Sequence, residues 1–354
     1  MDAILPAPAG APQSTPVEPV RGQRWGVARE ARVALVGAGL VLAALAAAVI
    51  APLWLLAIGP IVLGVPHVVS DVRYLCARPG FHRRKLLWLA AGVPIVWGIA
   101  NASVLGGLVA AAGAAAVARG DRARRAAAFT IALGLAAVAW SVGSKADVAF
   151  AHLHNFLAVA LWWAWRPRIE RWHWIPLGLF AGGTVALLAG LAEPVMRATA
   201  GLTTPATWPT FARHVASLAP VSSPTLGVRI VLLYAFAQAV HYAVWLRLVP
   251  TEERGERAAS TWSQSMIGAV RSLRADVGVP VLALAALSAL AIALWAAVDL
   301  SRARTEYLRF AIFHGHLELV AVAIFFVEGW PARGPRAPVD QDGPGYFESR
   351  DGTG

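Results

Sequence analysis

Long apolar runs, repeated along most of the chain, constrain its fold more than any other feature of the sequence. A helix needs about 20 predominantly apolar residues to cross the hydrocarbon core of a bilayer. The runs predict an all-α fold, a polytopic transmembrane helical bundle of about 10 spans. The count ranges from eight to ten because the Ala/Gly-rich fourth run is short enough to be re-entrant or to merge with its neighbour. The runs are at residues 31–51, 53–75, 86–104, 105–118, 126–143, 147–165, 174–192, 226–248, 278–298 and 308–328.

Charge supports the same interpretation and excludes an ordinary soluble enzyme. Charged residues make up 14% of the sequence, against roughly 25% in soluble domains. The net charge of +11 comes from arginines clustered between alternate apolar runs, as expected of the cytoplasmic loops of membrane proteins. We therefore expect a bacterial inner-membrane protein with both termini in the cytoplasm, surrounded by lipid and without a nucleic-acid partner. The exception is the loop predicted to hold Arg302, Arg304 and Arg309, since this topology places it outside.

The chain divides into one transmembrane domain and two tails. Residues 1–30 and 330–354 are rich in Pro, Gly and Ala, and we expect both to be disordered and cytoplasmic. The transmembrane domain spans residues 31–329, and two of its long connections, 193–225 and 250–277, have room for interfacial helices. Cys76 is the only cysteine, which excludes an intramolecular disulfide and a multi-cysteine metal site within one chain.

Six of the nine histidines fall inside the predicted spans, and they indicate function most directly. An ionisable side chain in hydrocarbon costs a few kcal/mol unless it is paired, so such residues face the bundle interior and are commonly functional. The spans that carry them run in the same direction, and each histidine lies within about four residues, or roughly 6 Å, of mid-span. One membrane layer can hold them all, either as metal ligands or as hydrogen-bonding residues between helices. The six are His67, His152, His154, His241, His314 and His316.

Two carboxylates accompany these histidines at helical spacing. Asp71 follows His67 by four residues, and Glu318 follows His314 by four, so each pair shares a helix face. A carboxylate so placed can bind a metal or orient an imidazole on a neighbouring helix. Asp71 and Glu318 are therefore the candidate catalytic residues.

The remaining spacings limit which histidines can bind the same ion. His152 and His154 are two residues apart, as are His314 and His316, which separates them by about 200° around an ideal helix. One member of each pair is expected to point elsewhere, unless Gly315 permits a local distortion that brings its neighbours together. Sequence alone leaves the choice within each pair open.

The segment LGVPHVVSDVRYL resembles the signature of the Brp/Blh family of bacterial membrane beta-carotene dioxygenases. The match covers Pro66, His67 and Asp71, while the intervening residues are Val, Val and Ser where that family carries small residues. A late-helix histidine pair at four-residue spacing, expected in that family, is absent here. The resemblance implies an iron-dependent dioxygenase in which four histidines hold non-heme Fe(II), and O2 and a carotenoid meet at the iron. His67 is the one ligand that it assigns by motif.

Three functions remain open on the sequence. The leading hypothesis is a metal-dependent oxygenase or related oxidoreductase that acts on a lipid-soluble substrate such as a carotenoid, because imidazole suits Fe(II) and leaves positions open for O2. The first alternative is an electron carrier that holds heme b between paired histidines of facing helices. The second is a proton or metal-ion transporter with an intramembrane His/Asp/Glu relay. No nucleotide-binding loop or serine-hydrolase elbow occurs in the sequence.

Overall fold

The computed structural model describes residues 23–165, 171–199, 210–221, 223–253 and 262–330, and every regular element in these ranges is a helix. The predicted all-α fold is confirmed for this part of the chain. Most of the two predicted tails, residues 1–22 and 331–354, lies outside the described residues. Helix α1 (Gln23–Ile50) begins inside the segment 1–30 that was expected to be disordered, which corrects that boundary.

Six helical stretches are long and apolar enough to cross a membrane, and they indicate a membrane protein. Two shorter apolar stretches, Lys85–Asn101 and Val104–Val117, lie between the second and third of them. About ten spans is therefore not confirmed by helix length and hydropathy over the described ranges. The six stretches are Glu30–Ile50, Pro52–Ala77, Arg122–Val142, Pro224–Glu252, Val279–Val298 and Leu300–Glu328.

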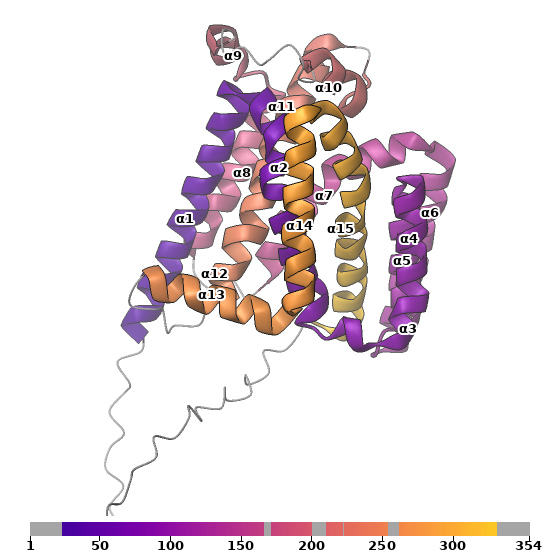
Figure 1. Cartoon of the computed structure of the whole chain (residues 1–354). Helices are drawn as coiled ribbons and strands as arrows, with labels where there is room; N and C mark the ends of the chain where they lie inside the picture. Colours follow the sequence, from indigo (N-terminus) through magenta and orange to yellow (C-terminus); the bar gives the residue numbers. More distant parts are fainter. Residues whose placement is uncertain (1–22, 166–170, 200–209, 222, 254–261, 331–354) are drawn as a thin grey trace, which may run out of the picture.

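The long helices run side by side, with short helices across the two ends of the bundle (Figure 1). Helices α9 (Glu193–Thr199) and α10 (Phe211–Leu218) lie at one end, which we call the α10 end. Helix α13 (Trp262–Val277) crosses the opposite end, the α13 end. The beginning of α1 and the end of α15 (Leu300–Glu328) are both at the α13 end.

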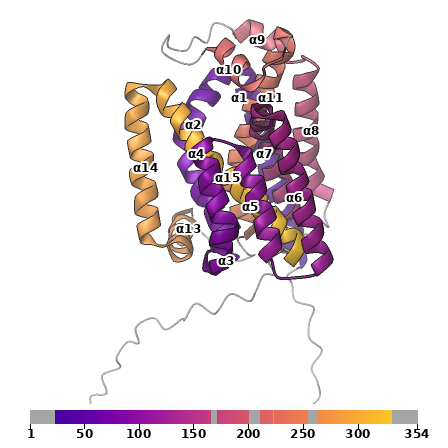
Figure 2. The ribbon, with the colours of Figure 1, turned by 90° about the vertical axis from the view of Figure 1, so that its right-hand side faces the viewer.

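Burial is concentrated in α11 and is lowest in α14, so the bundle has a clear inside and outside. Helix α11 (Pro224–Ala243) occupies the centre, and its apolar and polar side chains alike are largely buried. Helix α14 (Val279–Val298) has no buried residue although it is apolar throughout. It packs beside α2 (Pro52–Asp71) at the edge of the bundle (Figure 2). An exposed apolar face of this kind requires an apolar surrounding.

Helix α15 begins earlier than its apolar run predicted. The Asp299 side chain accepts a hydrogen bond from the backbone N–H of Arg302 and so caps the helix there. Arg302, Arg304 and Arg309 consequently belong to the first turns of α15 rather than to a loop. Their use as markers of a loop was wrong, and one of them, Arg304, is buried.

Glycines bring the helical hairpin formed by α4 (Val93–Asn101) and α5 (Val104–Val117) into close contact. A Cβ at Gly106 would lie 2.4 Å from the Cα of Gly98, and a Cβ at Gly113 would lie 2.0 Å from the backbone oxygen of Ala90. Small residues allow such backbone approach between membrane helices. The hairpin packs against α15 and α6 (Arg122–Val142).

The other described elements are the helices α7 and α8 and several short helical segments. They include three π-helical segments, a type of distortion that is frequent at functional sites. In chain order they are Val72–Ala77 (π), Phe81–Arg83, α3 (Lys85–Leu87), Trp88–Gly92 (π), α7 (Ser144–Ala164), Arg171–His173, α8 (Trp174–Leu188), Val244–Leu248 (π) and α12 (Val249–Glu253).

Candidate metal centre

Four histidine rings from four helices meet in the interior of the bundle. They are His67 of α2, His154 of α7, His241 of α11 and His314 of α15. Five of the six ring pairs among them have centroids 4.7–5.5 Å apart. We call these four residues the histidine cluster. Four of the six histidines predicted to lie at one depth meet here, and the cluster includes His154 but not His152.

Backbone carbonyls fix how three of the rings are oriented. Nδ1 of His67 lies 3.3 Å from the carbonyl oxygen of Leu63, and Nδ1 of His154 lies 3.1 Å from that of Phe150. Nδ1 of His314 contacts the carbonyl of Ala311 in the same way. A carbonyl can only accept, so each Nδ1 carries the proton and each Nε2 keeps its lone pair. Metal-bound histidines are commonly held in this arrangement.

The free nitrogens of the cluster are buried without partners. Nε2 of His67, Nε2 of His314 and both ring nitrogens of His241 have no hydrogen-bond partner among the described atoms. Burying a polar atom without a hydrogen bond costs roughly 1–3 kcal/mol. Helices α2, α11 and α15 each leave an unpaired ring nitrogen in the histidine cluster. This arrangement is costly unless one ligand binds these nitrogens together.

The spacing of the rings suits one shared metal ion, which His67, His241 and His314 can bind together. His154 contacts two of these rings but is not part of the group whose ligand atoms converge. Nitrogen ligands lie about 2.0–2.1 Å from a transition metal, which puts neighbouring imidazole centroids roughly 4.5–5.3 Å apart. The observed separations of 4.7–5.5 Å cover nearly the same range. Imidazole suits iron, copper, nickel and zinc, so the donor set fits Fe(II) without selecting it.

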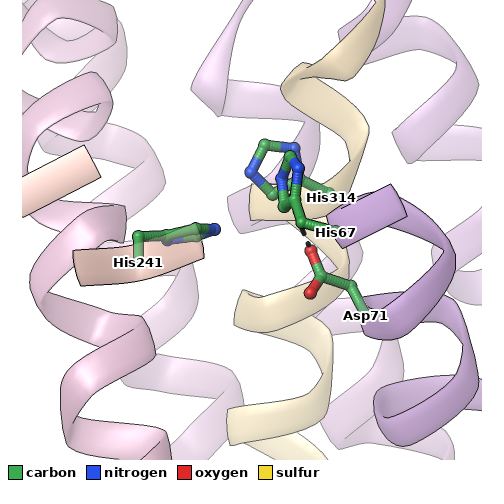
Figure 3. A group of neighbouring side chains, drawn as sticks. All are labelled: His67, Asp71, His241 and His314. Atoms are coloured by element: carbon green, nitrogen blue, oxygen red, sulfur yellow. Dashed lines mark ion pairs between the residues drawn. The ribbon is translucent and has the colours of Figure 1, made fainter. Parts of the chain in front are cut away.

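Asp71 extends the cluster toward the α13 end. One ligand atom each from His67, Asp71, His241 and His314 can be chosen so that all four lie within 4.8 Å of one another. Figure 3 shows His241 pointing across toward the other two rings, with Asp71 below His67. The closest approach of Asp71 is 4.0 Å, from its Oδ2 to Nε2 of His67, and neither carboxylate oxygen has a hydrogen-bond partner among the described atoms. Asp71 is therefore placed to bind the same ion or to orient His67.

Glu318 lies close to Asp71 but is held by a different partner. Its Oε1 accepts a 3.0 Å hydrogen bond from Nε1 of Trp245, and it lies within electrostatic range of Asp71. Ser70 bonds the backbone oxygen of Trp245 at 2.5 Å. These contacts join the end of α2 and the middle of α15 to the π-helical segment that follows α11. A second π-helical segment follows Asp71, so α2 and α11 both pass into π-helical turns directly beside the site.

The structure places His152 away from the histidine cluster. Its Nε2 lies 2.8 Å from the carbonyl oxygen of Leu218 in the last turn of α10, and its ring packs against Tyr234. The contact secures α10 to α7. No contact links His152 to the four clustered rings among the described residues, so the structure does not bring this predicted ligand to the site.

His316 also points away, toward the hairpin of α4 and α5. A Cβ at Gly98 would lie 2.6 Å from its Cε1, and a Cβ at Gly107 would lie 2.4 Å from its Cδ2. The ring is fully buried between these two glycines. Gly315 is helical like its neighbours, so no distortion brings His314 and His316 together.

A cavity of about 320 Å³ opens beside the cluster. It extends toward the α10 end, where Ser217 and Leu218 of α10 contribute to its wall. The volume lies at the lower end of the roughly 300–1,000 Å³ typical of small-molecule sites. All four clustered histidines line it, as do Tyr234, Gln238, Tyr242 and Tyr307.

Sequence reasoning missed the tyrosines and Trp245. Tyr242 packs on His67 with ring centroids 4.7 Å apart, and Tyr307 approaches α2 where Gly64 leaves room for its hydroxyl. Trp245 follows His241 by four residues, so helical spacing could have identified it as sharing the His241 face.

Comparison of the chain with protein-family models, with curated proteins and with solved structures finds no match.

Proposed function

We propose that the protein is a multi-pass membrane oxygenase that uses Fe(II) held by the histidine cluster to act on a lipid-soluble substrate. The observation that carries this proposal is the convergence of four histidine rings from four helices, three of which leave buried ring nitrogens without a hydrogen-bond partner. Iron, rather than another metal that imidazole binds, follows from the resemblance of the His67 segment to the Brp/Blh dioxygenases.

The proposed topology has ten spans and both ends at the cytoplasmic side. Helices α7 and α8 add to the six long and two shorter apolar stretches to match the ten predicted runs. Helix α7 has 21 residues, enough to span, but it carries a lysine, an aspartate and two histidines that lower its hydropathy. A lower hydropathy is expected of a helix that presents ligands to the bundle interior.

Each group of residues has a defined task in this proposal. When bound, Fe(II) would supply the redox chemistry that O2 requires to react with an organic molecule. The carbonyls of α2, α7 and α15 hold three imidazoles in the tautomer that leaves Nε2 free, and Asp71 orients or joins this set. The aromatic wall of the cavity excludes water and orients an apolar chain toward the cluster. In a dioxygenase cleavage, both atoms of O2 enter the product, and one carbon–carbon double bond becomes two carbonyl groups without a further reductant.

The alternatives fit the geometry less well. Two axial histidines of heme b stand on opposite faces of a porphyrin, whereas the clustered rings contact one another edge to face at 4.7–5.5 Å. A transport function predicts proton or metal-ion flux in proteoliposomes and no consumption of O2.

Turnover of a carotenoid provides the test of the proposed function. Purified protein supplied with Fe(II), O2 and beta-carotene is expected to bleach the pigment and release aldehyde, and His241→Ala is expected to abolish both. His152→Ala serves as the matched control, because it removes a histidine of the same membrane layer outside the cluster. Equal loss of activity in both variants, or equal activity in both, would contradict the assignment.

A further inference from the structure

A buried arginine near the α10 end has no acidic partner in the part of the chain that the structure describes. Arg304 of α15 is only 9% exposed, and its Nε bonds the backbone oxygen of Leu56. Among the described residues, no carboxylate pairs with its guanidinium. The charged or ionisable groups that act on it are Tyr234, Tyr242 and another arginine, Arg213. A buried charge without compensation costs several kcal/mol, so such a group is expected to meet an anion.

Helix α10 carries a second buried polar group within electrostatic range of Arg304. His214 is 1% exposed, and its Nε2 has no hydrogen-bond partner among the described atoms. Burial, together with the charges of Arg304 and Arg213, lowers the pKa of His214 to about 4. The imidazole is therefore neutral at pH 7, and its ring N–H can donate to an anion without adding charge.

Contacts from three directions hold α10, and with it His214, in place. Thr210 caps the helix by accepting a hydrogen bond from the backbone N–H of Arg213. Gly227 admits the helix closely to α11, since a Cβ there would lie 2.7 Å from Cγ1 of Val215. His152 secures the last turn from α7.

Arg304 and His214 each lie one helical turn from the cavity that leads to the histidine cluster, although neither residue lines it. Tyr307 and Leu308 follow Arg304 by three and four residues in α15, and both line that cavity. Leu218, one helical turn after His214, contributes to the cavity wall as well. A molecule with its apolar part in the cavity can thus have one end at this pair.

We infer that Arg304 and His214 form a binding site for the carboxylate or phosphate end of an amphiphile whose apolar chain occupies the cavity. A guanidinium fork matches the two oxygens of such an anion, and the unsatisfied histidine nitrogen supplies a further polar contact. Of the two anions, the structure favours the carboxylate of a long-chain acid, because the buried Arg304 and neutral His214 carry a single positive charge between them, while the neighbouring Arg213 is exposed to solvent. That this molecule is the substrate rests on the proposed function, whereas its binding does not.

Binding of palmitate to chelator-treated, detergent-purified protein tests the inference independently of any metal. Palmitate is expected to bind at least about tenfold more tightly than hexadecanol, which has the same chain without the charge, since hydrogen bonds to charged groups contribute about 1.5–3 kcal/mol. Arg304→Gln is expected to abolish this preference, and Arg304→Lys to retain part of it. The matched control is Arg302→Gln, which removes an exposed arginine from the same helix and is expected to bind as the wild type does.

Two outcomes would overturn the inference. The first is equal binding of palmitate and hexadecanol by the wild-type protein, a comparison that does not depend on how any variant folds. The second is binding of inorganic phosphate that requires Arg304 without any binding of palmitate, which would indicate a free-anion site. Loss of carotenoid turnover with intact palmitate binding would contradict the proposed function alone.

Discussion

Replacement of Gly113 by alanine provides a sharp test of the helix packing that supports the site. The added Cβ would lie 2.0 Å from the backbone oxygen of Ala90 and 2.8 Å from its carbonyl carbon. Ordinary contact needs about 3.4 Å, so the backbones must separate by roughly 1.4 Å, an overpacking that typically costs 1–3 kcal/mol. A backbone atom cannot rotate away as a side chain can. We expect the melting temperature in detergent, measured by the loss of the monodisperse size-exclusion peak, to fall by several degrees.

Gly134→Ala is the matched control for this experiment. Gly134 also lies within a membrane-length helix, α6, but a Cβ there would meet nothing within 4 Å. Alanine is favoured over glycine in helices by about 0.8–1.0 kcal/mol, so this variant is expected to melt at or above the wild-type temperature. A Gly113→Ala protein as stable as Gly134→Ala would refute the close approach of α5 to the segment that holds Ala90.

Three further predictions concern single side chains. His214 is held neutral by burial beside two arginines, with a pKa of about 4 against about 6.5 when unfolded; the unfolded chain therefore binds more protons between these values. The melting temperature should fall as the pH is lowered from 6.5 toward 4, less so in His214→Gln, and an identical fall in both proteins would contradict the assignment. Trp245→Phe removes the hydrogen-bond donor to buried Glu318 and is expected to lower the free energy of unfolding by about 1–3 kcal/mol. The double variant Trp245→Phe/Glu318→Leu removes the acceptor as well, so its melting temperature should not be lower than that of Trp245→Phe alone. His152→Ala releases a carbonyl of α10 and should speed amide exchange in that helix without lowering bound metal, and unchanged exchange would argue against this role.

The intramembrane histidines could be predicted from the sequence, because the position of a residue within its apolar run and the cost of burying an ionisable side chain in the bilayer both follow from the local sequence. His67, His241 and His314 lie near the middle of apolar runs, and an unpaired ionisable group there must face the interior. The choice of His154 over His152 could not be predicted, since both lie near mid-span on faces about 200° apart. It depends on where α10 docks, and that docking engages His152 instead.

Arg304 shows the opposite limit of sequence reasoning. Charge pattern alone suggested that it belonged to a loop, because loops hold most arginines of membrane proteins. The helix instead begins at Leu300 under the cap supplied by Asp299, which carries Arg304 into the bundle. His316 was equally unpredictable, since its environment is made by glycines of a hairpin about 200 residues earlier in the chain.

Metal content, together with the visible spectrum of the detergent-purified protein, tests the central claim most directly. We predict about one iron per chain without a Soret band in the wild type, in His152→Ala and in His316→Ala. Iron should be lost in His67→Ala and His241→Ala, which remove cluster ligands of α2 and α11. A Soret band, or iron retained when His67 and His241 are both replaced, would contradict a mononuclear site at the histidine cluster.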